Sequence, residues 1–219
     1  MADIKVSKEA ENVMENIKTR RSIRQFKPDP VPEEALQWII EAARWAPSAH
    51  NFQPTEYIII KDRKSLDFIA EVSHKAAKRV YAGKSFSEVK NMLLTVGDHQ
   101  ITDEQIELRR TGKIMPYLLT APVILLVVVD KGSPYYEADG WMAVQNLLLA
   151  ANAIGLGTIP TVRSIVNTKD KVEIQNYFDV PENYELLGIV PVGYPDESPE
   201  IFKRDIGELI HSEKFGVQE

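Results

Sequence analysis

The chain contains no cysteine among its 219 residues. Disulfide bonds, thiolate metal sites and cysteine nucleophiles are therefore excluded. No serine-centred nucleophile elbow appears either. The four histidines lack metal-ligand spacing relative to one another, so we expect no metal site. Any redox chemistry must consequently come from a bound cofactor.

Long hydrophobic runs and a basic overall charge are also lacking. The most apolar stretch, residues 122–129, is far too short to span a bilayer, and the first residues carry no signal-like apolar run. We therefore expect a cytoplasmic protein with no membrane partner. Against 32 Asp and Glu stand 26 Lys and Arg, which gives a net charge of −6 and argues against a nucleic-acid partner.

Hydrophobic periodicity predicts helices and strands that do not alternate regularly. The expected helices cover about residues 7–19, 33–45, 64–82, 86–94, 102–111, 137–154 and 169–178, and the expected strands cover 56–61, 122–130 and 185–194. Irregular alternation argues against a doubly wound parallel sheet and favours a mixed or antiparallel sheet with helices on both faces. Residues 1–219 are interpreted as one domain, with a helical insertion at about 83–116 as a candidate lid.

A basic cluster lies between the first predicted helix and the next. Within six residues it places three guanidiniums and two hydroxyls, those of Arg20, Arg21 and Arg24 with Thr19 and Ser22. Guanidiniums are planar, permanently charged donors that fit phosphate oxygens, and each charge-assisted bond is worth roughly 1.5–3 kcal/mol. Two or three such bonds would anchor a cofactor. Taken alone, however, a charge run of this kind is more often a solvated turn.

Three further segments favour cofactor binding by the basic cluster over a solvated turn. Ala-Pro-Ser-Ala-His-Asn-Phe-Gln-Pro occupies 46–54, Gly-Leu-Gly-Thr-Ile-Pro occupies 155–160, and Lys-Arg-Asp at 203–205 follows Pro-Val-Gly-Tyr-Pro at 191–195. In this order and spacing, the four segments resemble the FMN-dependent nitroreductase family. That family commonly shows Arg-Arg-Ser-x-Arg-x-Phe, Pro-Ser-x-x-Asn-x-Gln-Pro, Gly-Leu-Gly and a late Pro-x-Gly-Tyr with a basic residue. The resemblance covers about residues 13–216.

The resemblance implies an α+β fold, a three-layer α/β/α sandwich with a mixed, mostly antiparallel sheet, as an intertwined homodimer. FMN would bind at the dimer interface. Arg20 and Ser22 would meet the phosphate and ribityl chain, Arg24 the pyrimidine edge, and Arg21 would contribute less directly. Lys203 or Arg204, with Arg204 preferred, would close the phosphate site from the C-terminal side.

Two neutral segments would meet the flavin ring. Polar side chains after the second helix suit the ring carbonyls and nitrogens, and in the family this segment contacts flavin held mainly by the other subunit. Backbone groups after Gly-Leu-Gly would approach flavin N5, the hydride-accepting atom, because glycine permits conformations closed to other residues. The residues assigned to these two roles are Pro47, Ser48, Asn51 and Gln53, and Thr158, Ile159, Pro160 and Thr161.

The expected activity is hydride transfer from NADH or NADPH to FMN, followed by reduction of a small-molecule acceptor such as a nitroaromatic or a quinone. No acid or base side chain is required, so no catalytic residue is assigned. Reductive dehalogenation and oxygen-dependent flavin breakdown in cobalamin-ligand synthesis, both known in relatives of this fold, remain alternatives. So does a flavin-binding protein without turnover. A nucleic-acid-binding basic arm is disfavoured by the net charge.

Overall fold

The computed structural model describes residues 6–95, 102–111, 117–162 and 165–217. Its centre is a four-stranded sheet in the order β1-β2-β4-β3, comprising β1 (Thr55–Ile60), β2 (Val123–Asp130), β4 (Tyr184–Gly193) and β3 (Gly157–Thr158). Each neighbouring pair is antiparallel, with Ile58 opposite Leu126 and Leu126 opposite Ile189. The continuous apolar run of β2 forms a strand because both of its faces are covered.

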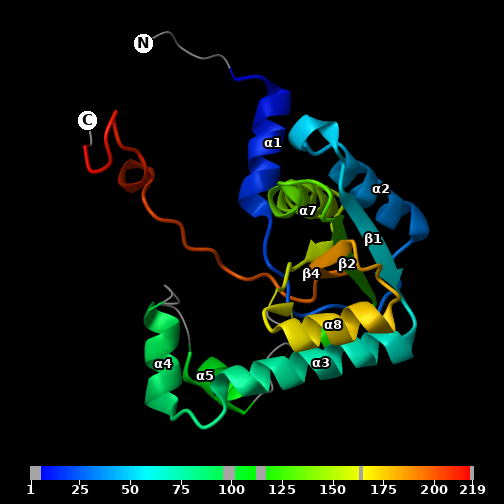
Figure 1. The fold of residues 1–219 in the computed structure, drawn as a ribbon. Helices are drawn as coiled ribbons and strands as arrows, with labels where there is room; N and C mark the ends of the chain where they lie inside the picture. Colours follow the sequence, from blue (N-terminus) through cyan, green and yellow to red (C-terminus); the bar gives the residue numbers. More distant parts are fainter. Residues whose placement is uncertain (1–5, 96–101, 112–116, 163–164, 218–219) are drawn as a thin grey trace.

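Side chains of β2 alternate between two hydrophobic cores, as the pleat of a strand requires. Ile124, Leu126 and Val128 pack into one core, and Leu125, Val127 and Val129 pack into the other. Helices α2 (Glu33–Arg44) and α7 (Tyr136–Ala153) cover one face of the sheet, with α1 (Lys8–Thr19) beside α7. Helices α3 (Arg63–Tyr81), α6 (Tyr117–Thr120) and α8 (Thr168–Tyr177) belong to the other side (Figure 1). The predicted three-layer α+β sandwich is confirmed.

Helix α7 approaches the sheet most closely at Gly140. A Cβ atom placed there would collide with Leu187 Cδ2 and lie 2.8 Å from Val129 Cγ1. Only glycine therefore allows the first turns of α7 to rest on β2 and β4. Since the cavity described below opens beside these turns, this close contact also fixes one wall of that cavity.

Two helices stand apart from the three layers at the far end of α3. They are α4 (Phe86–Thr95) and α5 (Asp103–Arg110), and Figure 1 shows them away from the sheet. They share a small core with the end of α3, built from Tyr81, Val89, Leu93 and Ile106. These helices fall within the segment proposed as a lid. Residues 96–101 and 112–116 of that segment lie outside the described residues.

The C-terminal segment after β4 forms an arm that leaves the body of the molecule (Figure 1). Apart from a short turn, Ile206–Leu209, it has no regular structure, and most of its side chains are exposed. Several of these are large and apolar, with exposures of 70% at Phe202, 72% at Ile206 and 93% at Phe215. No helix in the described ranges is long and apolar enough to cross a membrane.

Candidate functional site

The basic segment after α1 is fixed by backbone pairing. Ile23 N–H donates to the Thr158 carbonyl at 3.0 Å, and a parallel bridge joins Ser22 to Thr158. Gly157 permits this approach, because a Cβ atom there would lie 2.7 Å from Ile23 Cγ1. The Gly-Leu-Gly motif and the arginine cluster, more than 130 residues apart in the sequence, are therefore neighbours in space.

The following residues are held against the chain just after β4. Lys27 N–H donates to the Tyr194 carbonyl at 2.9 Å, and Gln25 N–H donates to Glu197 Oε1 at 3.1 Å. The backbone N–H of Arg24 donates to the same carboxylate oxygen. Glu197 therefore accepts hydrogen bonds from the backbone and holds Arg24 and Gln25 against the chain after β4.

A cavity of about 180 Å³ lies where these segments meet. Its lining includes Arg20, Gly155, Thr158 and Ser198. Arg20 Nη1 is buried and has no hydrogen-bond partner among the described residues. An unpaired buried donor is costly, and more so when the group is charged. The cavity is therefore suited to an anion that would accept a hydrogen bond from Arg20.

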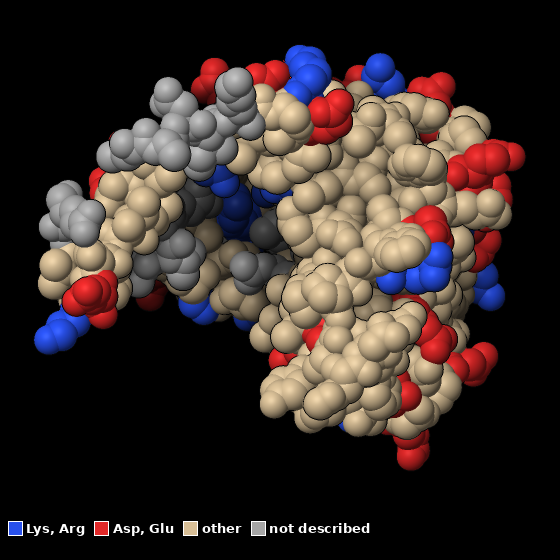
Figure 2. Space-filling model, turned by 90° about the horizontal axis from the view of Figure 1, so that it is seen from above, with Lys and Arg blue, Asp and Glu red and all other residues tan. Residues whose placement is uncertain are grey.

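The three arginines of the cluster have different surroundings. Arg21 is occupied by backbone carbonyls, since its Nε donates to Pro199 at 2.9 Å and its Nη1 to Lys18 at 2.7 Å. Arg24 is exposed and donates to the Ser22 carbonyl at 3.2 Å. Figure 2 shows a hollow beside the main body with Lys and Arg atoms gathered in its depth, although the whole chain carries a charge of −6. Of the three arginines, Arg20 is the best candidate to bind a ligand, because its buried Nη1 has no hydrogen-bond partner among the described residues.

Residues after Gly-Leu-Gly are partly committed to the protein's own backbone. Thr161 and Ile189 exchange two backbone hydrogen bonds, at 2.9 and 3.0 Å, while Thr158 accepts from Ile23. Ile159 is buried, and Pro160 is half-buried. This segment therefore forms a rigid ledge at the end of the sheet beside the basic cluster.

The second predicted segment forms a tight loop between α2 and β1. His50, Asn51 and Gln53 have φ values of 52°, 56° and 54°, a left-handed geometry rare outside glycine. Each such residue costs of order 1–3 kcal/mol and persists only when its surroundings impose it. Within the loop, Gln53 N–H donates to Ser48 Oγ at 2.9 Å. The loop therefore combines exposed side chains with a backbone held in a defined, left-handed geometry.

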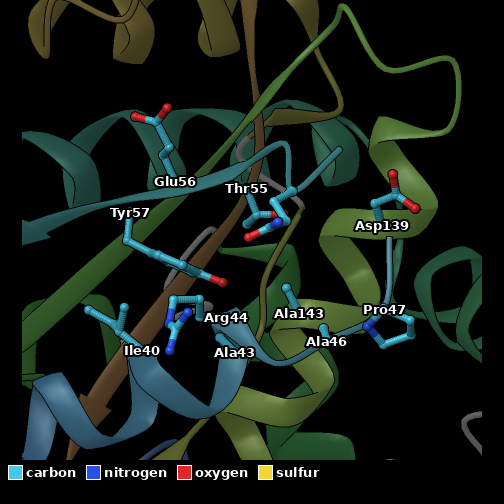
Figure 3. A pocket seen from close by; sticks show the side chains of 11 residues that line it. Ile40, Ala43, Arg44, Ala46, Pro47, Thr55, Glu56, Tyr57, Asp139 and Ala143 are labelled. Atoms are coloured by element: carbon cyan, nitrogen blue, oxygen red, sulfur yellow. The ribbon is translucent and has the colours of Figure 1, made fainter. Parts of the chain in front are cut away.

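This loop borders a second cavity, of about 420 Å³, between the end of α2 and the starts of β1 and α7 (Figure 3). Pro47, Gln53 and Asp139 contribute to its lining. Tyr57 extends from β1 toward α2, and its hydroxyl is buried without a partner in the described chain. Burial raises the pKa of Tyr57, so its hydroxyl remains a neutral donor at physiological pH.

Arg44, at the rim of this cavity, is bound to α2. It donates from Nε to Glu41 Oε2 at 2.8 Å and from Nη2 to Oε1 at 2.6 Å, and Trp45 Nε1 donates to Oε1 at 2.8 Å. These donors, Arg44 first, lower the pKa of Glu41 to about 2. Because the pair is exposed, we assign it no stabilising energy.

The single chain does not gather all fourteen predicted site residues in one place. Arg20 and Thr158 line the first cavity, Pro47 and Gln53 line the second, and the two cavities share no lining residue. Lys203 and Arg204 lie exposed on the C-terminal arm, where Arg204 Nε lies 3.2 Å from Glu208 Oε2. Within one chain, the predicted site is therefore split into at least two parts.

Sequence reasoning assigned no role to several residues at these cavities. Asn152, in the first cavity, donates to Asn16 Oδ1 at 2.8 Å and thereby fastens the end of α1 to α7. Its signal in the sequence is a polar residue interrupting an apolar helix. Tyr57 and Asp139, in the second cavity, carry no comparable signal. No group of three metal-ligating side chains occurs within the described ranges.

The fold is one that known proteins share. The crystal structure of oxidized iodotyrosine deiodinase bound to FMN and 3-iodo-L-tyrosine matches with a TM-score of 0.74 and 30% identity, over 92% of this chain and 98% of that one. A structure described as a nitroreductase in complex with FMN, from Desulfovibrio desulfuricans, matches in fold with a TM-score of 0.66, 24% identity, and coverage of 93% and 97%. The architecture thus defines the chain as a nitroreductase-like α+β protein.

Sequence comparison gives the family. An iodotyrosine deiodinase of Thermotoga neapolitana is 31% identical over 86% of this chain and 91% of its own length. A candidate NADH dehydrogenase/NAD(P)H nitroreductase of Methanothermobacter thermautotrophicus is 33% identical over 97% and 92%. The model of the nitroreductase family matches residues 17–194. The chain belongs to the nitroreductase family, a family of flavoenzymes.

Proposed function

We propose that the protein is an FMN-dependent oxidoreductase whose first cavity holds the FMN phosphate. The observation that carries this proposal is the buried Nη1 of Arg20, which has no hydrogen-bond partner in the described part of the chain. A phosphate oxygen would satisfy that nitrogen with a charge-assisted hydrogen bond. Ser22 lies beside the same ledge and adds a short neutral donor. Two structural relatives were solved with FMN, which supports the same ligand.

The remaining residues of the cluster would support the cofactor in other ways. Arg24 is exposed and would face the pyrimidine edge, where its charge favours the negative charge that reduction places on flavin. At about 4 Å and an effective dielectric near 20, one charge contributes about 4 kcal/mol of Coulomb energy, which solvent reduces. Arg21 would hold the segment in place through the carbonyls it already binds.

We further propose a homodimer with flavin at its interface. Several apolar side chains lie exposed on α1, on α2 and on the arm, namely Val13, Met14, Ile17, Trp38, Trp45, Phe202 and Ile206. Such surfaces in water mark interaction sites. A second copy would cover them and bring its loop at 47–53 to the flavin, which would reunite the two halves of the site. Lys203 or, preferably, Arg204 would then close the phosphate site, and helices α4 and α5 would act as a lid.

Bound FMN would carry two electrons from NADH or NADPH, the donor, to a nitroaromatic or a quinone, the acceptor. The chain's own contribution would be to bind and orient these molecules and to exclude water. Ser48, Asn51 and Gln53 would offer neutral polar groups to the ring. The backbone of Thr158, Ile159 and Thr161, with Pro160, would supply the rigid ledge on which the flavin rests.

A second candidate function is reductive dehalogenation of a halogenated phenol. It is favoured by the similarity to iodotyrosine deiodinases in both sequence and structure. In that reaction the carbon–halogen bond breaks, two electrons and a proton reach the ring carbon, and halide leaves. Anaerobic turnover of a nitrophenol against an iodophenol, with product and iodide measured, separates the two functions. Flavin that no nicotinamide reduces would contradict the nitroreductase-type activity.

A further inference from the structure

Asp139 is a buried carboxylate with two hydrogen-bond donors. It lies near the start of α7 with 3% of its surface exposed. Its Oδ1 accepts from Ala49 N–H at 3.1 Å, and its Oδ2 accepts from the hydroxyl of Ser133 at 3.2 Å. Ser133 is itself completely buried. Asp139 therefore ties the loop after α2 to the turn that precedes α7.

The charge of Asp139 is used for these bonds rather than for an ion pair. No salt bridge involves Asp139 in the parts of the chain that are described. Two neutral donors and the positive end of the α7 dipole surround it instead. Burying a carboxylate costs free energy unless it is hydrogen-bonded, so the bonds from Ala49 and Ser133 offset the burial of Asp139.

The loop that Asp139 holds is the strained one. Ala49 directly precedes His50 and Asn51, which have left-handed geometry, and Gln53 follows with the same sign of φ. At its other end the loop is fastened by Asp130 N–H, which donates to the Pro54 carbonyl at 2.9 Å. The bond to Asp139 thus fastens the start of the loop, and Asp139 lines the same cavity as Pro47 and Gln53. Figure 3 shows Asp139 and Pro47 at this cavity.

We propose that Asp139 is a positioning residue that locks the loop at 48–53 in the geometry needed to meet the flavin. This role rests on the proposed function, because the loop's polar groups are the ones assigned to the flavin ring. Asp139 acts through Ala49 N–H and Ser133 rather than by touching the cofactor. Without it, the Ala49 amide loses its acceptor and the left-handed residues relax toward ordinary conformations.

Substitution can separate hydrogen bonding from charge. Asp139→Asn keeps an acceptor for Ala49 N–H and gains an amide donor for the Ser133 hydroxyl, while it removes the charge. Asp139→Ala removes both bonds. Glu137→Gln is the matched control, since Glu137 is an exposed carboxylate in the same turn of α7. Ser133→Ala weakens the clamp by one bond and serves if Asp139→Ala does not fold.

Two measurements are needed on the full chain. The first is amide hydrogen exchange of residues 48–53 without FMN, which tests the clamp independently of any cofactor. The second is the FMN dissociation constant, with the visible spectrum of the bound flavin. We expect Asp139→Ala to accelerate exchange in this loop, to shift the flavin spectrum and to weaken FMN binding about 10-fold, the factor that follows if the released loop holds its flavin-binding geometry about a tenth of the time. Asp139→Asn and Glu137→Gln should stay within about 3-fold of the parent protein.

Unchanged exchange at 48–53 in Asp139→Ala would overturn the clamp. Equal defects in Asp139→Asn and Asp139→Ala would overturn the hydrogen-bond argument, because charge alone would then matter. If the parent chain bound no FMN, the proposed function would fail and with it the link from the clamp to flavin. The exchange experiment would still decide whether Asp139 holds the loop.

Discussion

Arg20→Ala is the substitution that most directly tests the phosphate cavity. The Nη1 of Arg20 is buried and has no hydrogen-bond partner among the described residues, and Arg20 lines a cavity of about 180 Å³. One charge-assisted hydrogen bond contributes roughly 1.5–3 kcal/mol, so its loss should weaken FMN binding about 10- to 150-fold. Because the substitution also removes an unsatisfied buried nitrogen, the melting temperature of the FMN-free protein should not fall.

Riboflavin distinguishes a lost phosphate contact from a damaged site, since it has the ring and the ribityl chain but no phosphate. We expect Arg20→Ala to lower FMN affinity selectively, so that its preference for FMN over riboflavin falls. Titration of flavin fluorescence measures both constants. Arg63→Ala is the control, because Arg63 pairs with Asp67 on α3 and lines neither cavity. Adding Arg204→Ala should empty the site.

Two results would refute this reasoning. An FMN affinity within about 3-fold of the parent's would mean that Arg20 does not bind the phosphate. An equal loss of riboflavin and FMN affinity would mean that the substitution disturbs the cavity as a whole. Either result would mean that binding of the FMN phosphate does not explain the buried Nη1 of Arg20.

The remaining predictions concern packing, assembly and chemistry. Gly157→Ala would place a Cβ atom 2.7 Å from Ile23 Cγ1. We therefore expect the free energy of unfolding, measured by thermal denaturation, to fall by about 1–3 kcal/mol and FMN binding to weaken. Ile206→Asp would put a charge on the 72% exposed apolar arm, so sedimentation should show a dimer for the parent chain and monomers for the variant. A variant that stays dimeric would exclude this part of the arm from the interface. Iodophenol turnover without nitrophenol turnover would favour the dehalogenase candidate.

The fold was largely predictable because its signals are local. The ten helices and strands expected from periodicity all occur within one residue of the predicted bounds, including the buried strand β2 with its continuous apolar run. The two-residue strand β3 was missed, since so short an element has no periodicity and exists only through pairing with β4. The short helix α6 and the 3-10 turns were missed for a similar reason.

The site was less predictable, because roles depend on contacts that are distant in sequence. The four motifs point to candidate site residues, and only the structure separates Arg20, whose buried nitrogen has no partner among the described residues, from Arg21, which binds backbone carbonyls. That difference depends on where the chain after β4 passes. The contacts that hold the ends of the loop at 48–53 likewise come from residues distant in sequence, Asp139 and Asp130, which a local pattern does not reveal.

The most direct test of the central claim is the visible absorption spectrum of the purified protein supplied with FMN, followed by anaerobic addition of NADH or NADPH. The account predicts flavin bands at about one FMN per chain, retained after gel filtration, that bleach when the nicotinamide is added. A chain that retains no FMN would contradict the account, and the basic cluster would then be a solvated turn on an inherited fold.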